Sequence, residues 1–274
     1  MLRRILLSVI ACLIIFSLVQ AENYAVLITG DTPYGDAIGP KTWGGGTEPG
    51  PYDEFWSDTF VMWETLWKYG WKDENIFVLF GNGEDWVFTG CTNERYYADP
   101  QYNIEPWNID HVTDDAAYYQ DVVDIFAYLD GLMTDDDFLF VWTFDHGSTW
   151  PGGSTLELMG QDNITDEEFA AIMPEHYDKR VFWMQQCHSG GFIDDLHNEK
   201  TVILTACGAS ESAGPCLDLN PDGGDPLENE YYAPDNDYYT HGEFNYHVFN
   251  AARYETIAYF NFLWEPDLNL DCFT

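Results

Sequence analysis

Five short apolar runs constrain the fold more than any other feature of the chain. Each run is almost continuously hydrophobic, and they cover residues 24–29, 75–80, 137–144, 180–186 and 201–206. Such strands are typical of parallel sheets that are buried on both faces. Segments with helical spacing lie between or after them, at 55–69, 113–132 and 242–252, and a capping box at Thr165–Glu168 predicts a short further helix. The alternation predicts an α/β fold, with a mainly parallel sheet between layers of helices.

The N-terminus predicts export. Arg3 and Arg4 precede an apolar run from Ile5 to Val19, and Ala21 is the small residue at a cleavage site. We therefore expect residues 1–21 to be a signal peptide and residues 22–274 to be one secreted domain, periplasmic or extracellular. A lipoprotein cleavage box at residues 9–12 is the alternative. No later segment has the length and hydropathy of a membrane span, so stable membrane insertion after cleavage is not expected.

The charge of the chain restricts its partners. Without the two arginines of the leader, 8 Lys and Arg face 48 Asp and Glu, and the net charge is near −40. Such a surface argues against binding to nucleic acid or to an anionic membrane. It suits a cationic substrate, calcium or simple solubility. The aromatic content of 17% is too high for a disordered acidic polymer.

The cysteine count is odd once Cys12 has left with the leader. The remaining cysteines are Cys91, Cys187, Cys207, Cys216 and Cys272. In an oxidising compartment an odd count leaves one thiol unpaired. Cys207 and Cys216 are close in sequence and are candidates for a disulfide. Parity alone does not identify the unpaired thiol, but Cys187 stands out because His188, Ser189 and two glycines follow it.

Two loops carry groups suited to nucleophilic chemistry. The run 137–144 leads into Asp145, His146 and Gly147, and the run 180–186 leads into Cys187. If these strands are neighbours, a histidine and a thiol meet at one edge of the sheet, as in thiol hydrolases. A nearby imidazolium favours the reactive thiolate. We expect the N–H groups of Gly147 and Cys187 to hold an oxyanion. Taken singly, each side chain also fits a structural role, namely a buried inert thiol or a histidine bonded to a carbonyl group.

The same loops resemble a known family. The segments "FDHGST" and "QQCHSGG" are similar to those of the cysteine peptidases that include legumain, caspases, metacaspases, clostripain and gingipains. The histidine motif, the 41-residue interval to the cysteine and "TACGASESA" at 205–213 are closest to legumain. The segment "CHSGG" is closer to metacaspases, and "GEFNYHVFNAA" at 242–252 resembles a late helix of bacterial members.

This resemblance implies a caspase-like three-layer sandwich around a mainly parallel six-stranded sheet. It implies that Cys187 is the nucleophile and that His146 is the general acid/base. It also implies that specificity depends on the residue before the scissile bond. In legumain an Asn supports the catalytic histidine, and Asp31 or Thr32 stands at that place here. The family's specificity residues are also absent. Acidic and apolar residues stand around Asp53 where legumain has an Arg, and Gln185 stands where metacaspases have an Asp, two residues before the cysteine.

The specificity pocket must therefore be built from other residues. Its predicted wall is Ser210, Glu211 and Ser212, with Asp145 as a further candidate. The acidic surroundings favour a basic substrate residue, while an asparagine preference stays open.

A possible calcium site follows this segment. Asp218, Asn220 and Asp222 alternate before Gly223, as in the first half of a calcium loop, but the second half lacks its usual ligand. A polar turn is the alternative. No required cofactor is expected, and Ca²⁺ is the only candidate ion.

The sequence thus predicts a secreted cysteine endopeptidase that cleaves peptides or proteins through a thioester on a Cys187–His146 dyad. Two alternatives stay open. One is a transpeptidase or ligase that uses the same thioester, and the other is a catalytically silent module that binds extracellular peptides or calcium.

Overall fold

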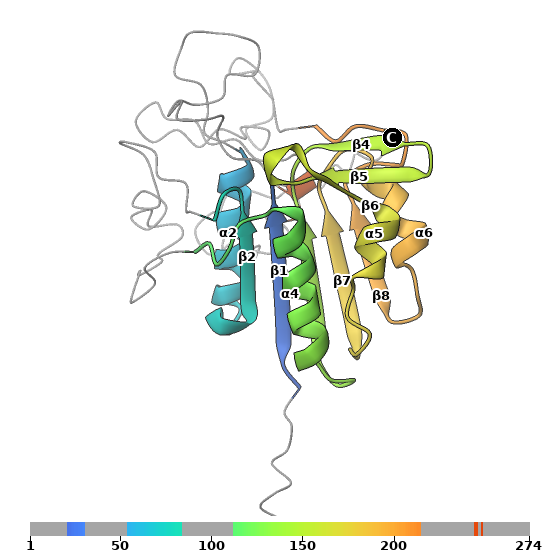
Figure 1. Cartoon of the computed structure of the whole chain (residues 1–274). Coiled ribbons are helices and arrows are strands. Elements are labelled where there is room, and N and C mark those ends of the chain that lie inside the picture. Colours follow the sequence, from blue (N-terminus) through green and yellow to red (C-terminus); the bar gives the residue numbers. More distant parts are fainter. Residues whose placement is uncertain (1–20, 31–53, 84–111, 215–243, 246–247, 249–274) are drawn as a thin grey trace, which may run out of the picture.

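The fold is built around a parallel five-stranded sheet (Figure 1). The computed structural model describes residues 21–30, 54–83, 112–214, 244–245 and 248. In spatial order the strands are β2 (Ile76–Phe80), β1 (Asn23–Thr29), β3 (Phe138–Thr143), β7 (Lys179–Met184) and β8 (Thr201–Thr205). Every neighbouring pair is parallel, so the carboxyl ends of all these strands meet at one edge.

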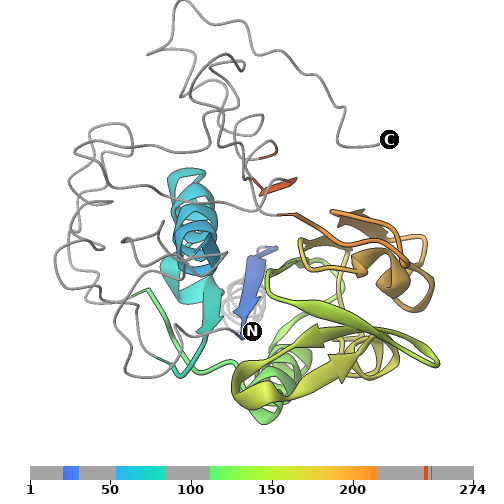
Figure 2. The same cartoon turned by 90° about the horizontal axis from the view of Figure 1, so that it is seen from above.

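Helices cover both faces of this sheet, as the apolar runs predicted. Helix α2 (Glu54–Lys68) packs on one face, where Trp63 and Phe60 meet Trp142 and Trp183. Helices α4 (Tyr119–Leu132), α5 (Asp166–Ala171) and α6 (Ile193–Leu196) pack on the other. Figure 2 shows α2 and α4 on opposite sides of β1. Since each strand is covered on both sides, alternation of polar and apolar residues is absent from the central strands.

A second, smaller sheet lies over the carboxyl edge of the first. Strands β4 (Gly147–Trp150), β5 (Gly153–Glu157) and β6 (Asn163–Thr165) form it in antiparallel order. These strands were not predicted from the sequence, because they are short and contain many glycine, serine and threonine residues. The hairpin signal was present at Pro151-Gly152, between β4 and β5.

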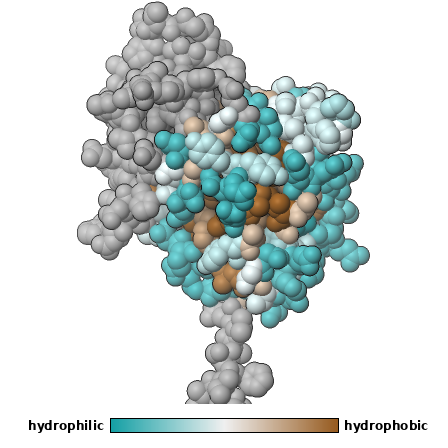
Figure 3. Space-filling view, in the orientation of Figure 1, coloured by the Kyte–Doolittle hydropathy of each residue, from teal (hydrophilic) through white to brown (hydrophobic). Residues whose placement is uncertain are grey.

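Short 3₁₀ turns complete the described elements. They are η1 (Asp73–Asn75), η2 (Met159–Gln161) and η3 (Ser189–Phe192). The late segment contributes helical residues at Phe244, Asn245 and Val248. Figure 3 shows that the described face is largely hydrophilic, with a limited apolar area near its centre.

Three predictions can be compared directly with this structure. The capping box is confirmed, because Thr165 Oγ1 accepts the Glu168 N–H while the Glu168 carboxylate accepts the Thr165 N–H. The helix predicted from residue 113 begins only at Tyr119. The backbone N–H groups of Asp114 and Asp115 donate to the Val78 carbonyl instead, so this segment runs beside β2. The main sheet has five strands within the described residues, where the resemblance implied six.

Phe169 tests the packing of the helical layer on β7. It is fully buried, and its ring lies 5.7 to 6.3 Å, between centroids, from the rings of Phe126, Phe182 and Phe192. Phe169→Ala is expected to lower the free energy of unfolding by about 3–5 kcal/mol, because a cavity replaces these contacts. Urea unfolding measures the loss. Tyr128→Ala, at a side chain that is 56% exposed, is the control and should cost roughly 1 kcal/mol or less. Equal losses would contradict the assigned core.

Candidate active site

The register of β3 and β7 brings the two predicted loops together. Thr143 is the partner of Met184 in the parallel ladder, and the Gln185 N–H continues the ladder by donating to the Thr143 carbonyl at 2.9 Å. His146 lies three residues beyond Thr143, and Cys187 lies three residues beyond Met184. The two side chains therefore leave adjacent strands at the same level.

The backbones of the two loops are in direct contact. Gly147 lies so close to the carbonyl oxygen of Cys187 that a Cβ atom there would overlap with it. The same Cβ would stand 3.0 Å from the carbonyl oxygen of Thr155 on β5. Only glycine fits between these two backbones, so the glycine after His146 allows the two loops to lie in direct contact.

The His146 ring packs against an aromatic side chain. Its ring stands edge-on to the ring of Phe55 on α2, with centroids 5.5 Å apart and an interplanar angle of 77°. Phe55 is buried and packs in turn against Phe144, at 4.7 Å. The Asp145 carboxylate accepts the backbone N–H of His146. Phe55 is a contact that the sequence analysis did not identify, since α2 is distant in sequence from the His146 loop.

Cys187 carries a free, partly buried thiol. Its Sγ donates to the carbonyl of Ala213 at 3.5 Å. Its backbone N–H makes no hydrogen bond to any described residue. The Gly147 N–H is also free of the β4–β5 ladder. Glu157 donates to the His146 carbonyl, so His146 and Glu157 form a hydrogen-bonded pair. The next pair, Gly147 with Leu156, is therefore one without mutual hydrogen bonds. Neither of the N–H groups predicted to hold an oxyanion therefore donates to a neighbouring strand.

The Cys187 loop is hydrogen-bonded to the loop that follows β8. His188 N–H donates to the Glu211 carbonyl at 2.9 Å, and Gly190 N–H donates to the Cys207 carbonyl at 3.0 Å. His188 Nδ1 lies 3.0 Å from the Ala209 carbonyl, so this side chain binds the neighbouring loop. His188 also adopts φ +60°, a left-handed conformation that non-glycine residues rarely adopt. These contacts fix the backbone on both sides of Ser189.

Cys207 is a free thiol in the structure. Its Sγ lies 3.3 Å from the Glu211 carbonyl and 3.7 Å from the Ser189 hydroxyl. Its predicted disulfide partner, Cys216, lies outside the described residues, so that disulfide stays a prediction. The calcium candidates Asp218, Asn220 and Asp222 lie outside them as well, as do Asp31, Thr32 and Asp53. Among the described residues, no group of three or more His, Cys, Asp or Glu side chains is placed to hold a metal ion.

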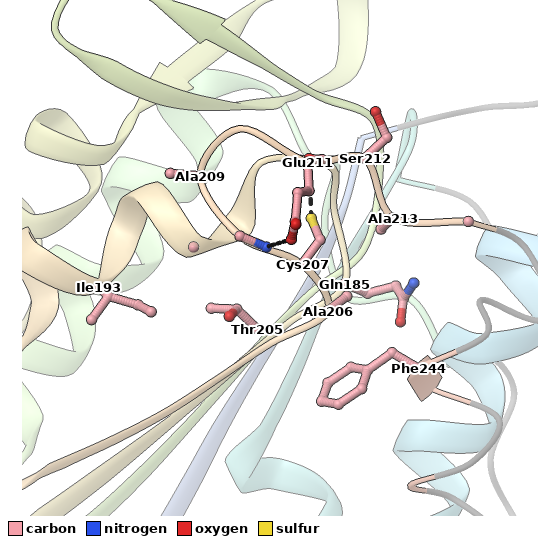
Figure 4. A pocket seen from close by; sticks show the side chains of 13 residues that line it. Gln185, Ile193, Thr205, Ala206, Cys207, Ala209, Glu211, Ser212, Ala213 and Phe244 are labelled. Atoms are coloured by element: carbon pink, nitrogen blue, oxygen red, sulfur yellow. Dashed lines mark hydrogen bonds between the residues drawn. The ribbon is translucent and has the colours of Figure 1, made fainter. Parts of the chain in front are cut away.

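A cavity of about 600 Å³ is lined by Cys207 and by Ala213, whose carbonyl accepts from the Cys187 thiol (Figure 4). Glu211 and Ser212 line it, as predicted, whereas Ser210 and Asp145 do not. Asp145 is instead buried next to His146. The structure adds lining residues that the sequence analysis did not assign to a pocket, from the end of β7, from the loop after β8 and from the late helix: Gln185, Gly190, Ile193, Thr205, Ala206, Cys207, Gly208, Ala209, Ala213, Gly214 and Phe244.

Comparison with known proteins finds a family similarity in one segment of the chain. Residues 132–238 match the model of the Peptidase C13 family. This segment contains β3, β7, β8 and the loops that carry His146 and Cys187. The match confirms the resemblance to legumain-type cysteine peptidases, and the parallel sheet between helices is consistent with their caspase-like fold. No curated protein matches the chain. Within the described residues, no helix has the length and apolar character needed to cross a membrane.

Gly147→Ala tests the contact between the two loops. The added methyl group must push the Gly147 and Cys187 backbones apart, and such overpacking costs about 1–3 kcal/mol. Urea unfolding should show this loss. Gly131→Ala in α4 is the matched control, because nothing lies within 4 Å of its added Cβ, and it should stabilise the protein by roughly 0.5–1 kcal/mol. If Gly147→Ala stabilises as much as Gly131→Ala, the close approach is wrong.

Proposed function

For this legumain-type cysteine peptidase, we propose that Cys187 is the nucleophile and that His146 is the general acid/base in the hydrolysis of peptide bonds. One observation carries the assignment. The loops after β3 and β7 leave the sheet at the same level, and Gly147 packs on the Cys187 carbonyl. The family match supplies the class of substrate, since a peptidase acts on peptides or proteins.

The reaction begins with attack of the Cys187 thiolate on the scissile carbonyl carbon. A carbon–sulfur bond forms, and the carbonyl electron pair moves to oxygen. The N–H groups of Cys187 and Gly147 are available to stabilise that oxyanion, because neither is needed by the ladders around it. Donors held by a rigid sheet edge favour the tetrahedral intermediate over the planar substrate, which is the condition for catalysis.

His146 then delivers a proton to the leaving amine as the carbon–nitrogen bond breaks. The product of this step is a thioester on Cys187. In the second half, water attacks the thioester, His146 accepts the proton of that water, and the acid product leaves with the thiolate restored. Phe55 limits where the imidazole can move, because its ring forms one wall beside it.

We also propose that the enzyme acts outside the cytoplasm. The charged and apolar pattern of residues 1–21 supports this assignment. A net charge of −38 suits a soluble extracellular protein and disfavours contact with nucleic acid. N-terminal sequencing of the secreted product should begin near Glu22.

Cleavage of a mixed peptide library tests the nucleophile. The wild-type chain should cleave it, while Cys187→Ala and His146→Ala should each lower kcat/KM by about 10³-fold or more, because each removes a group that acts in every turnover. His176→Ala is the matched histidine control, since His176 is exposed and paired with Asp135 away from the site.

The library is run with and without calcium. Adding a primary amine tests whether the thioester is also transferred rather than hydrolysed.

The outcomes separate the candidate activities. Cleavage that survives Cys187→Ala would contradict the assignment of the nucleophile. No cleavage by a folded, reduced wild type would favour a silent binding module. A product carrying the added amine would favour the transpeptidase.

Thiol labelling gives an independent test of the dyad. Iodoacetamide near neutral pH should label Cys187 faster than Cys207, because Cys187 is the proposed nucleophile and has a histidine as its proposed partner. His146→Ala should slow labelling of Cys187 by roughly 10-fold and leave Cys207 unchanged. Peptide mass mapping identifies the labelled residue. Equal slowing at both cysteines would indicate a change of fold rather than loss of a dyad.

A further inference from the structure

The cavity beside Cys187 has the position of a site for a substrate side chain. Ala213, whose carbonyl accepts from the Cys187 thiol, lines it, and so does Gln185, two residues before the nucleophile. The substrate residue whose carbonyl carbon bonds to Sγ would therefore have its side chain near Ala213 and this cavity. The cavity volume of about 600 Å³ is within the range of small-ligand pockets.

The lining divides into an apolar part and a charged part. Phe244, Ile193 and Ala206 present ring and methyl groups, while Glu211 presents a carboxylate. Figure 4 shows Glu211 and Cys207 on one side of the cavity, with Phe244 and Gln185 on the other. No lysine, arginine or histidine is among the described lining residues. A long side chain with an apolar stem and a cationic end is complementary to such a lining.

The Glu211 carboxylate is held in place but keeps capacity to bind. Its Oε2 accepts the Gly208 N–H at 2.8 Å, and the Glu211 carbonyl accepts the His188 N–H at 2.9 Å. The first bond fixes the side chain, and the second ties the Glu211 backbone to the Cys187 loop. A carboxylate offers about four acceptor positions, so most remain available for the donors of an ammonium or guanidinium group.

We propose that this cavity receives the side chain of the residue before the scissile bond and that Glu211 makes the enzyme prefer lysine or arginine there. The inference rests on the proposed function. Asparagine is too short to use both parts of the lining. Aspartate or glutamate would place a second anion beside Glu211, in a chain whose net charge is already −38.

Four fluorogenic peptides that differ only in the last residue test the inference. That residue is lysine, arginine, norleucine or asparagine, and norleucine is the neutral analogue of lysine. The wild type should cleave the lysine and arginine peptides roughly 10-fold faster, in kcat/KM, than the other two. Added salt should reduce this preference, because it screens the partly exposed carboxylate.

Glu211→Gln separates charge from structure. The amide oxygen still accepts the Gly208 N–H, so the loop is kept while the charge is lost. The variant should lose roughly 10-fold on the lysine and arginine peptides and change the norleucine peptide by no more than about twofold. Equal loss on all four peptides, or an asparagine preference of the wild type, would overturn the assignment of Glu211. These results differ from failure of the proposed function, in which wild type cleaves no peptide or cleavage does not require Cys187.

Discussion

Parallel pairing between β3 and β7 is the constraint on which the site depends. The six paired positions from Phe138–Lys179 to Thr143–Met184 set the height at which both strands leave the sheet. Trp142 and Trp183 lie opposite each other and pack on the α2 side, while the preceding pair, Val141 and Phe182, packs on the α4 side. A register shift of one residue would turn every side chain of one strand to the wrong face. The large buried side chains thus hold His146 and Cys187 at one level.

The sheet edge alone does not fix the backbone of the Cys187 loop. That loop turns sharply at His188, whose left-handed φ is costly for a residue with a Cβ atom. The cost is offset by hydrogen bonds from His188 and Gly190 to the loop after β8. Since β8 is paired with β7 from Arg180–Thr201 to Met184–Thr205, the second loop is itself positioned by the sheet. Three successive strand ends, after β3, β7 and β8, therefore assemble one site.

The central strands and the positions of the loops after β3 and β7 could be predicted from the sequence, because burial on both faces produces long apolar runs with polar loops after them. The small sheet was missed because its strands have weak hydrophobic patterns, and a segment such as "GSTW" is held by its hairpin rather than by its propensities. The late start of α4 was missed because Asp114 and Asp115 bond to β2, a contact that helical spacing cannot reveal. Phe55 and Phe244 were missed as neighbours of the site because both come from segments distant in sequence.

Phe244 reaches the cavity through a buried polar network. Asn245, beside it, is fully buried, and its N–H donates to Gln185 Oε1 at 3.0 Å. Its side-chain amide donates to the Asp58 carboxylate at 2.7 Å and accepts from Trp142 Nε1 at 3.3 Å.

Such a network fixes one arrangement, because any displacement of Asn245 would leave several buried polar groups unpaired. It joins α2, β3, the residue after β7 and the late helix, and its member Gln185 lines the cavity. The same bond that anchors Asn245 also holds the Gln185 side chain, so the shape of the cavity beside Cys187 is set by the core and not by the loops alone.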